Sequence, residues 1–511
     1  MPPVAPLPPG EGDRALVPVL VSITLVVSVL SSLGAPLIPA VASSLSVSVS
    51  TAQWSLTSAL LAGVVAAPIL GRLGDGRWRR ETILATLGIV IVGGVVAGLA
   101  RSFPALIAGR SMQGIGLGLA PIAMAVARNH LPPARAAGVI GLLSVSAAAG
   151  VGIGYPLSGL VATELDVFAA FLFGSVLAAA ALVLAYLHIP PSRETGGVPL
   201  DLPGALVGGA GLIAALVAIG QGEEWGWGSA PVLLCFALAA VLIAIWVRLQ
   251  LRTAAPLVEL RLLRLRAVRG ADGAAFLLGI ALYMFLTLVT GFVQVPADRG
   301  FGFGASPLLA GIVLVPFSLT ALLAARLMWR LEPLIGARAV LVSGSCLIGV
   351  GGAFFALGHA SLWEAFAVMG VLGVGFGFTF AAIPGLLSRA VPRHEIGSVT
   401  GFFQVVRSIG FSVGSALVAS VLAAHTAGPA ELPAESGYVA AAWIGTGACI
   451  FAALWAAFLT PPGRGPGERE RSALEDAELA GAGLIDVELE PRRSGERSAL
   501  HLSPRGRHVQ G

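Results

Sequence analysis

One acidic side chain stands among several arginines in the short connection between the second and third apolar segments of the chain. The connection reads Gly71-Arg72-Leu73-Gly74-Asp75-Gly76-Arg77-Trp78-Arg79-Arg80. Gly71 would allow two helices to approach closely, and Asp75 can cap or pair at a helix end. Arg79 and Arg80 can bridge to a neighbouring helix, which would form a charge latch that breaks when this side of a membrane protein opens. Anchoring of the loop by positive charge is the alternative, but it leaves Asp75 unexplained.

Arg110 is a second residue whose position requires a partner. It lies seven residues after the start of the fourth apolar segment at residue 103, which places it roughly 10 Å into a membrane at the rise of an α-helix. An unpaired guanidinium costs several kcal/mol at that depth, so Arg110 must face a wet cavity or a partner. A static tie to backbone carbonyls is compatible with this position, and so is a working role in a wet cavity.

Further polar and aromatic side chains lie where they could reach a central cavity. These residues are Gln53, Gln113, Tyr283, Gln294, Phe402, Gln404 and Arg407. Few charges and many apolar walls favour an amphipathic or lipophilic small molecule as the ligand. Because none of the first six predicted helices carries a mid-span carboxylate, the cavity has less reason to prefer dications than monovalent or neutral molecules.

The composition indicates what kind of protein must position these side chains. Of the 511 residues, 56% are hydrophobic and 11% are charged, and the mean hydropathy is +0.89. This leaves too little polar surface to cover a water-soluble globule of this size, so lipid must be the solvent. We therefore predict an all-α polytopic protein of the plasma membrane.

All 31 basic residues are arginine, which excludes several mechanisms. A phosphate-binding GxxxxGK[ST] loop and the Schiff bases of pyridoxal or retinal all require a lysine amine. Cys235, Cys346 and Cys449 lie in apolar runs without CxxC spacing, and no histidines have metal-ligand spacing on a helix. We expect no metal site, no cofactor, no nucleic-acid partner and no enzymatic activity, because the spans hold no catalytic constellation.

Apolar runs of about 20 residues follow one another along the chain, separated by short segments that carry Arg, Pro or Gly. We predict fourteen membrane-spanning helices, at residues 16–41, 52–71, 82–100, 103–127, 136–160, 167–187, 202–220, 230–249, 268–293, 306–324, 338–358, 362–386, 398–424 and 438–459. Placing the N-terminus in the cytoplasm puts 27 of the 31 arginines on the inner side and only Arg101 and Arg299 outside. This bias predicts that both termini are cytoplasmic.

The chain also repeats itself weakly, which predicts two related halves. Residues 128–135 resemble residues 389–393 at an offset of 261, and residues 71–73 resemble residues 325–327 at an offset of 254. Parallel halves are typical of transporters with the substrate site between them, although chance similarity of short loops is the alternative. The predicted parts are a cytoplasmic segment, a six-helix bundle, a linker with two inserted helices, a second six-helix bundle and a disordered cytoplasmic tail, at residues 1–15, 16–187, 188–267, 268–459 and 460–511.

Three motifs carry a resemblance to a known family. The loop from Gly71 to Arg80 resembles the G-x-L-a-D-r-x-G-r-r loop of the major facilitator superfamily. Leu106-x-x-x-Arg110-x-x-Gln113-Gly114-x-Gly116 closely matches the pattern of that family's fourth helix. The third motif looks like the fifth-helix antiporter motif, in which small residues let helices touch. Its residues are Gly150, Gly154, Pro156 and Gly159.

This resemblance implies the major facilitator fold and a role for Arg110 in proton coupling. Three further patches resemble the 14-helix drug:proton antiporter branch, namely Gln53-Trp54, residues 222–227 and residues 256–264. The chain is therefore similar to multidrug efflux transporters from about residue 16 to residue 459.

The carrier of the proton is not evident from that branch, which usually has an Asp in its first helix. This chain reads Leu30-Ser31-Ser32-Leu33-Gly34-Ala35-Pro36 there. Another carboxylate would be needed, and an acid in a low-dielectric cavity is suited to binding and releasing protons. We place Asp75 first and Asp272 second. The other candidates are Glu164, Asp166 and Glu364, and a solvated structural carboxylate is the alternative for each.

Together these patterns predict a secondary active transporter that works by alternating access. We expect it to act as a monomer in the lipid bilayer and to export drug-like or amphipathic small molecules in exchange for protons. A facilitator or uptake carrier for a small metabolite is the alternative. A third possibility, a membrane scaffold or sensor that does not transport, predicts that Asp75 and Arg110 tolerate replacement by alanine.

Overall fold

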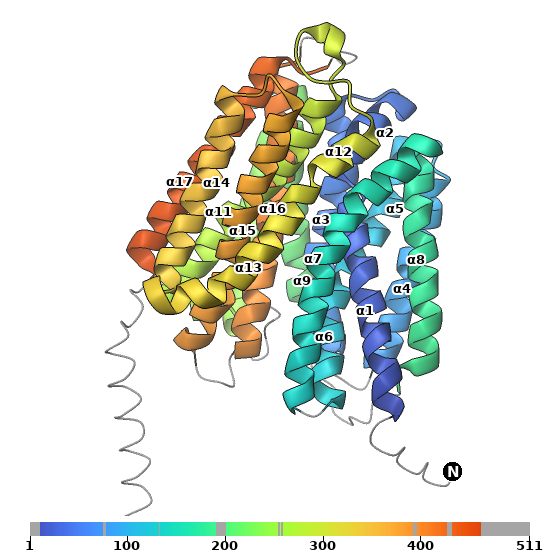
Figure 1. The fold of residues 1–511 in the computed structure, drawn as a ribbon, viewed down its shortest axis with the longest axis vertical. Coiled ribbons are helices and arrows are strands. Elements are labelled where there is room, and N and C mark those ends of the chain that lie inside the picture. Colours follow the sequence, from blue (N-terminus) through green and yellow to red (C-terminus); the bar gives the residue numbers. More distant parts are fainter. Residues whose placement is uncertain are drawn as a thin grey trace, which may run out of the picture. The chain divides into compact units, whose positions relative to one another are not determined.

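The computed structural model describes residues 11–74, 78–131, 133–190, 201–253, 256, 259–391, 396–426 and 432–460. Within these ranges the chain is helical and contains no strand (Figure 1). The described helices belong to one compact unit. Asp75, residues 1–10 and the predicted tail from residue 461 onward lie outside the described residues.

The first part of the chain forms eight α-helices and two short 3-10 helices. They are α1 (Glu11–Ser32), η1 (Ala35–Leu37), α2 (Ile38–Leu45), α3 (Val49–Gly74), α4 (Arg79–Gly98), α5 (Phe103–Ile115), η2 (Gly116–Gly118), α6 (Leu119–His130), α7 (Pro133–Glu164) and α8 (Val167–His188). The first predicted span is interrupted at Pro36, because proline lacks an N–H and its ring clashes with the preceding turn. The fourth is interrupted by η2, where glycines weaken the helix.

The rest of the chain begins with the two helices of the predicted insertion. The elements are α9 (Leu202–Trp225), α10 (Ala230–Arg252), η3 (Leu260–Arg264), α11 (Arg266–Gln294), η4 (Ala297–Arg299), α12 (Pro307–Val313), α13 (Val315–Ile335), α14 (Ala337–Leu357), α15 (Leu362–Ala390), α16 (Ile396–Ala424) and α17 (Glu435–Leu459). The tenth predicted span is divided at Leu314, two residues before Pro316. Proline again accounts for the break.

Twelve helical segments of the described chain are long and apolar enough to cross a membrane. They correspond to twelve of the fourteen predicted spans. The other two, 103–127 and 136–160, fold as α5 to α6 with η2 between them and as α7, and neither is among the twelve. The number of fourteen crossings therefore stays a prediction.

The helices from α1 to α8, called the first set, pack mainly among themselves, and so do the helices from α11 to α17, called the second set. In the first set α1 packs on α7, and α4 packs on α5 and α8. In the second set α14 packs on α15 and α17, and α11 packs on α16 and α17 (Figure 1). Between the sets, α3 contacts α16, and α7 contacts α12 and α13. Helix α9 contacts both α3 and α16 and pairs with α10.

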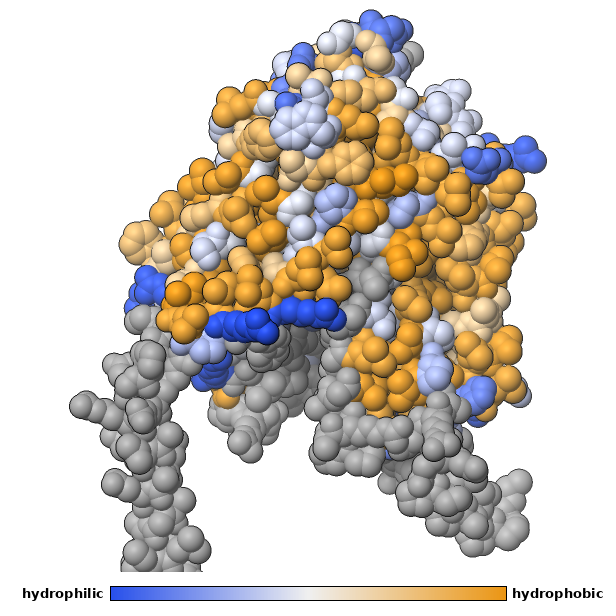
Figure 2. Space-filling model, in the orientation of Figure 1, coloured by the Kyte–Doolittle hydropathy of each residue, from blue (hydrophilic) through white to orange (hydrophobic). Residues whose placement is uncertain are grey.

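Large apolar side chains remain exposed on the outside of the helices. On α10, Leu234, Leu238 and Val241 are 69%, 52% and 55% exposed. Figure 2 shows apolar residues across the middle of one face, with hydrophilic residues toward its upper and lower limits. In water such a surface would drive association, whereas lipid tails are as apolar as leucine and cover it.

Glycines permit the closest helix contacts within the first set. A methyl group at Gly114 of α5 would overlap the backbone of Ala59 on α3. Gly109 of α5 and Gly93 of α4 each face the backbone of the opposite helix in the same way. Because lipid supplies no hydrophobic driving force between helices, this close packing contributes directly to stability.

We expect Gly114→Ala to lower the free energy of unfolding by about 1 to 3 kcal/mol, the usual range for overpacking, because α3 and α5 would have to separate. Gly88→Ala on α4 is the matched control, since a methyl group there meets no described atom within 4 Å and alanine favours the helix. The measurement is thermal unfolding of both purified variants in detergent. Equal melting temperatures for the two variants would contradict the expectation.

Candidate functional site

Arg110 lies in a buried polar cluster of the first set and is only 1% exposed. Its Nε donates to the backbone carbonyl of Ser55 on α3 at 3.1 Å. Its Nη1 donates to Oε1 of Gln113, one turn along α5, at 2.8 Å. The tie to a backbone carbonyl is therefore present in this conformation, and it fixes α5 against α3.

Gln113 extends this cluster to a third helix. Its Nε2 donates to the backbone carbonyl of Phe171 on α8 at 3.1 Å. The ring of Phe171 also lies 5.1 Å from the guanidinium carbon of Arg110. A cavity beside Arg110, lined by α1, α3, α5 and η2, has a volume of about 10 Å³, which is the scale of one water molecule. The cluster is thus packed, with little free space around the charge.

A second polar cluster joins the two sets of helices. Gln53 on α3 donates through Nε2 to the hydroxyl of Ser415 on α16 at 2.8 Å and to the hydroxyl of Thr287 on α11 at 3.4 Å. Thr57, one turn further along α3, shares a hydrogen bond of 2.7 Å with the Ser415 hydroxyl. All four side chains are buried. These hydrogen bonds hold α3 against α16 and α11.

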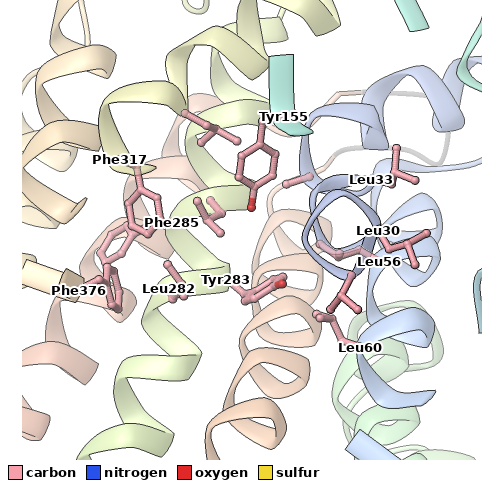
Figure 3. Packing of buried hydrophobic residues seen from close by; sticks show 14 of the residues in the cluster. Leu30, Leu33, Leu56, Leu60, Tyr155, Leu282, Tyr283, Phe285, Phe317 and Phe376 are labelled. Carbon is pink, nitrogen blue, oxygen red and sulfur yellow. The ribbon is translucent and has the colours of Figure 1, made fainter. Parts of the chain in front are cut away.

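Tyr283 on α11 is buried where the two sets of helices meet (Figure 3). It lies within electrostatic range of the guanidinium groups of both Arg110 in the first set and Arg407 in the second. Tyr155 on α7 lies nearby (Figure 3). Figure 3 shows the two tyrosine rings between leucines of α1 and α3 on one side and phenylalanines such as Phe376 on the other.

Arg407 on α16 is surrounded by aromatic rings. Its guanidinium carbon lies 5.2, 5.3 and 5.4 Å from the ring centres of Phe380, Phe403 and Phe411. Its Nε is buried and has no hydrogen-bond partner among the described residues. Arg407 therefore differs from Arg110, whose side chain donates to a carbonyl and an amide.

Asp272 is a buried carboxylate near the start of α11, and it is 1% exposed. In the described part of the chain, neither of its carboxylate oxygens has a hydrogen-bond partner. Burying an ionised carboxylate without a partner is strongly unfavourable. Asp272 is therefore the described acid whose surroundings differ most from those of a solvated structural carboxylate.

The predicted charge latch is described only in part, because Asp75 lies outside the described residues. Arg79 is buried at the start of α4. Arg80 donates through Nη2 to the backbone carbonyl of Tyr186 near the end of α8 at 2.7 Å and lies 5.4 Å from its ring centre, so it bridges to a neighbouring helix. At Gly71 a Cβ would meet no described atom within 4 Å. Among the described residues no helix approaches Gly71 closely, and the contact expected there stays a prediction.

Three predicted cavity residues lie apart from both polar clusters. Gln294, in the last turn of α11, donates to the carbonyl of Thr290 in its own helix at 2.8 Å. Gln404 is exposed on α16, and Phe402 is part of the apolar core. The structure therefore places Gln53 in the cluster between the sets and Gln113 with Arg110 in the cluster of the first set. Tyr283 lies within electrostatic range of Arg110 and Arg407.

Three other candidate acids lie at helix ends. Asp166 accepts the N–H of Ala169 at the start of α8, and Glu364 accepts the N–H of Ser361 in the capping box of α15. Glu164 is exposed at the end of α7. Capping satisfies N–H groups that have no partner within the helix, which gives Asp166 and Glu364 a structural role.

The predicted helix-packing motif places α7 at the boundary between the two sets. Methyl groups at Gly150 and Gly154 would collide with serines of α1, and one at Gly159 would collide with the backbone at the start of α12. Pro156 lies beside Gly311 of α12. The small residues of α7 thus contact the first set on one side and the second set on the other.

Some residues of these clusters could not be singled out from the sequence. Ser415 and Thr287 are hydroxyl residues in apolar helices, where such residues are common. Glu332 on α13 is buried and forms an ion pair with Arg389 at the end of α15. The only sequence signal for this pair is an acid close to an arginine-rich loop at the end of an apolar run.

The fold and the buried polar clusters define a multi-pass helical membrane protein of the secondary-transporter class. A family model described as Major Facilitator Superfamily matches residues 20–415 and also residues 273–500. The chain belongs to the Major Facilitator Superfamily. This confirms the predictions of an all-α membrane protein with the major facilitator fold and of a transporter.

Similar proteins have been named as exporters or resistance proteins. Multidrug resistance protein Stp of Mycobacterium tuberculosis is 28% identical over 375 residues, covering 73% of this chain and 69% of that protein. Cephamycin export protein CmcT of Amycolatopsis lactamdurans is 28% identical over 421 residues, covering 78% of this chain and 83% of that protein.

Solved structures of other transporters have the same fold. The crystal structure of the POT family transporter PepTSo covers 87% of this chain and 97% of its own, with a TM-score of 0.62 and 14% identity. The xylose transporter XylE from E. coli covers 89% of this chain and 99% of its own, with a TM-score of 0.56 and 12% identity. At this identity the likeness concerns the fold alone.

The contact between Gln53 and Ser415 leads to a prediction about coupling between the two sets. We expect Gln53→Ala and Ser415→Ala to be non-additive, with an interaction free energy of about 0.5 to 1.5 kcal/mol, because each removes the same buried hydrogen bond. The measurement is a double-mutant cycle on unfolding in detergent micelles. Ser22→Ala combined with Ser415→Ala is the control, since Ser22 donates only within α1, to the carbonyl of Val19. Additivity of the Gln53 pair would contradict the expectation.

Proposed function

We propose that the chain is a proton-coupled exporter of drug-like, amphipathic small molecules that works by alternating access. The observation that carries this proposal is a polar centre contributed by both sets of helices, with the buried Arg110 in one set and the buried Tyr283 and half-buried Arg407 in the other. In transporters built from related halves, substrate sites lie between the halves near the membrane midplane. The position of this centre fits that arrangement.

The contacts between the two sets support an alternating mechanism. Near the predicted outer side, Thr163 in the last turn of α7 accepts the N–H of Leu308 at 3.2 Å, and Gln53 in the first turns of α3 donates to Ser415. Each such hydrogen bond contributes about 0.5 to 1.5 kcal/mol. The sets can therefore part at this side without loss of the apolar contacts within each set. We infer that the described conformation is closed on the predicted outer side.

The relatives support export of amphipathic compounds. Stp carries the name of a multidrug resistance protein and CmcT that of a cephamycin export protein, and each is matched over more than 70% of this chain. Aromatic side chains such as Phe380 and Phe411 beside Arg407 provide apolar walls with a few polar groups. Such walls favour small molecules with both apolar and polar parts.

We further propose that Asp272 carries the coupled proton, with Asp75 as a second candidate at the predicted inner gate. The burial of Asp272 and the lack of a hydrogen-bond partner for its oxygens support this choice. A carboxylate in this environment is favoured as the neutral acid. When the helices move and water reaches Asp272, the water stabilises the ionised carboxylate and the proton can leave.

The proposal includes a definite organisation in the membrane. Fourteen crossings, two six-helix bundles at residues 16–187 and 268–459, and a linker with two inserted helices at 188–267 are supported by the packing within each set. Both termini in the cytoplasm follow from the arginine distribution. We propose that the transporter works as a monomer with its substrate, protons and lipid as partners.

The test is transport by the purified chain in liposomes under an imposed pH gradient. We expect at least one amphipathic dye from a panel of cations, anions and neutral molecules to accumulate against its own gradient. Asp272→Asn and Arg110→Ala are each expected to reduce uphill transport by at least about tenfold, since a change of about 1.4 kcal/mol has that effect. Asp75→Asn is expected to slow turnover, because the inner latch loses its carboxylate.

The control variant is Asp298→Asn, which removes an exposed carboxylate of η4 and should leave transport unchanged. Dye movement that only dissipates its own gradient, with or without a pH difference, would favour a facilitator instead. Full uphill transport by Asp272→Asn would exclude that residue as the proton carrier. No movement of any dye by the native chain, with or without a pH difference, would favour the scaffold or sensor.

A further inference from the structure

Arg407 differs in its hydrogen bonding from three other arginines on helices of the second set. Arg389 pairs with Glu332, and Arg266 donates to the carbonyl of Phe458 at 2.5 Å. Arg338 donates to the carbonyl of Ala457. Arg407, by contrast, has a buried Nε with no hydrogen-bond partner among the described residues, and three aromatic rings lie around its guanidinium. This Nε donor is therefore available to a ligand.

The charge near Tyr283 is not balanced by the described chain. Neither Arg110 nor Arg407 forms an ion pair with a described residue, and the described ion pairs lie elsewhere. Asp272 forms no ion pair with either arginine, and its oxygens have no hydrogen-bond partner among the residues that the structure describes. Two guanidinium groups near one tyrosine hydroxyl give this region an excess of positive charge. A ligand anion would reduce that excess, whereas a cation would be repelled.

An aromatic surface runs from Arg407 into the second set. The ring centres of Tyr283 and Phe411 are 4.7 Å apart, and those of Phe411 and Phe380 are 6.4 Å apart. Phe376 continues the series at 5.6 Å from Phe380. These spacings are typical of aromatic pairs, which favour a flat aromatic body as a further member of the stack.

We propose that the substrates are aromatic organic anions, whose carboxylate or phenolate oxygen binds Arg407 beside Tyr283 while the ring packs on Phe380 and Phe411. This inference rests on the proposed function and narrows it, because it selects anions among amphipathic molecules. An anionic oxygen can accept a charge-assisted hydrogen bond from an N–H of the Arg407 guanidinium. The tyrosine hydroxyl can donate a second hydrogen bond to the same oxygen.

The test is equilibrium binding of two dyes to the full-length protein in detergent, where no pH gradient exists. Fluorescence anisotropy measures the binding. The probes are fluorescein, an anion, and tetramethylrhodamine methyl ester, a cation with the same ring system. We expect fluorescein to bind roughly tenfold more tightly than the cationic dye. Arg407→Gln should weaken fluorescein binding by roughly tenfold to a hundredfold, the range for a hydrogen bond to a charged group, and should not weaken the cationic dye.

The matched control is Arg101→Gln, which removes an exposed arginine between α4 and α5 and should leave both affinities unchanged. Arg407→Lys keeps the charge and should keep the preference for fluorescein at lower affinity. Tighter binding of the cationic dye by the native chain, or unchanged fluorescein binding in Arg407→Gln, would overturn the inference. If Arg407→Gln does not fold, the comparison of the two dyes on the native chain still decides.

The two proposals fail separately in these experiments. Loss of fluorescein preference in detergent overturns the substrate class, and uphill transport of other dyes in liposomes would still support proton-coupled export. Preference for fluorescein without uphill transport overturns the coupling and leaves the substrate class supported. Binding in detergent and flux in liposomes therefore test different statements.

Discussion

Lipid offers no hydrogen bonds, so the backbone groups of each spanning helix must bond within the chain, and a charged side chain in the bundle needs a partner or a wet cavity. Arg110 shows what this constraint requires. Its guanidinium reaches the Ser55 carbonyl on α3 and the Gln113 side chain on α5, and Gln113 in turn reaches the Phe171 carbonyl on α8. One buried charge thus fixes three helices in a single arrangement. Close packing between them, which Gly114 permits, brings the carbonyl of Ser55 within reach.

Polar groups at the boundary between the two sets also form hydrogen bonds within the chain, but these groups are uncharged. Here the hydrogen bonds join neutral groups, such as the Gln53 amide and the Ser415 hydroxyl, and the backbones touch at small residues such as Gly159. Neutral hydrogen bonds contribute less than those of charged groups. The interior of each set is therefore held more firmly than the surface where the sets meet, which is what rigid-body movement between them needs.

Much of the fold follows from local sequence patterns, whereas the site follows from tertiary contacts. Apolar runs predicted each helix closely, because a spanning helix must be long and apolar wherever it packs. The breaks at Pro36 and Leu314 were missed, since a proline in a span can be accommodated or can divide it. Arg110 was identified by its charge, but its partner is the backbone of Ser55, which no side-chain pattern reveals. Ser415 could not be distinguished from the many other serines that pack in apolar helices.

The two interior arginines then take different parts in the same site. The hydrogen bonds of Arg110 are already used to join helices of the first set, so this residue contributes a fixed positive charge. The Nε of Arg407 has no hydrogen-bond partner in the described part of the chain, and the three rings around the guanidinium attract its charge without accepting a directed hydrogen bond. A ligand that binds Arg407 therefore displaces no existing hydrogen bond at this Nε. The second set can then bind the ligand directly through Arg407. The first set interacts with the ligand only at longer range, through the charge of Arg110.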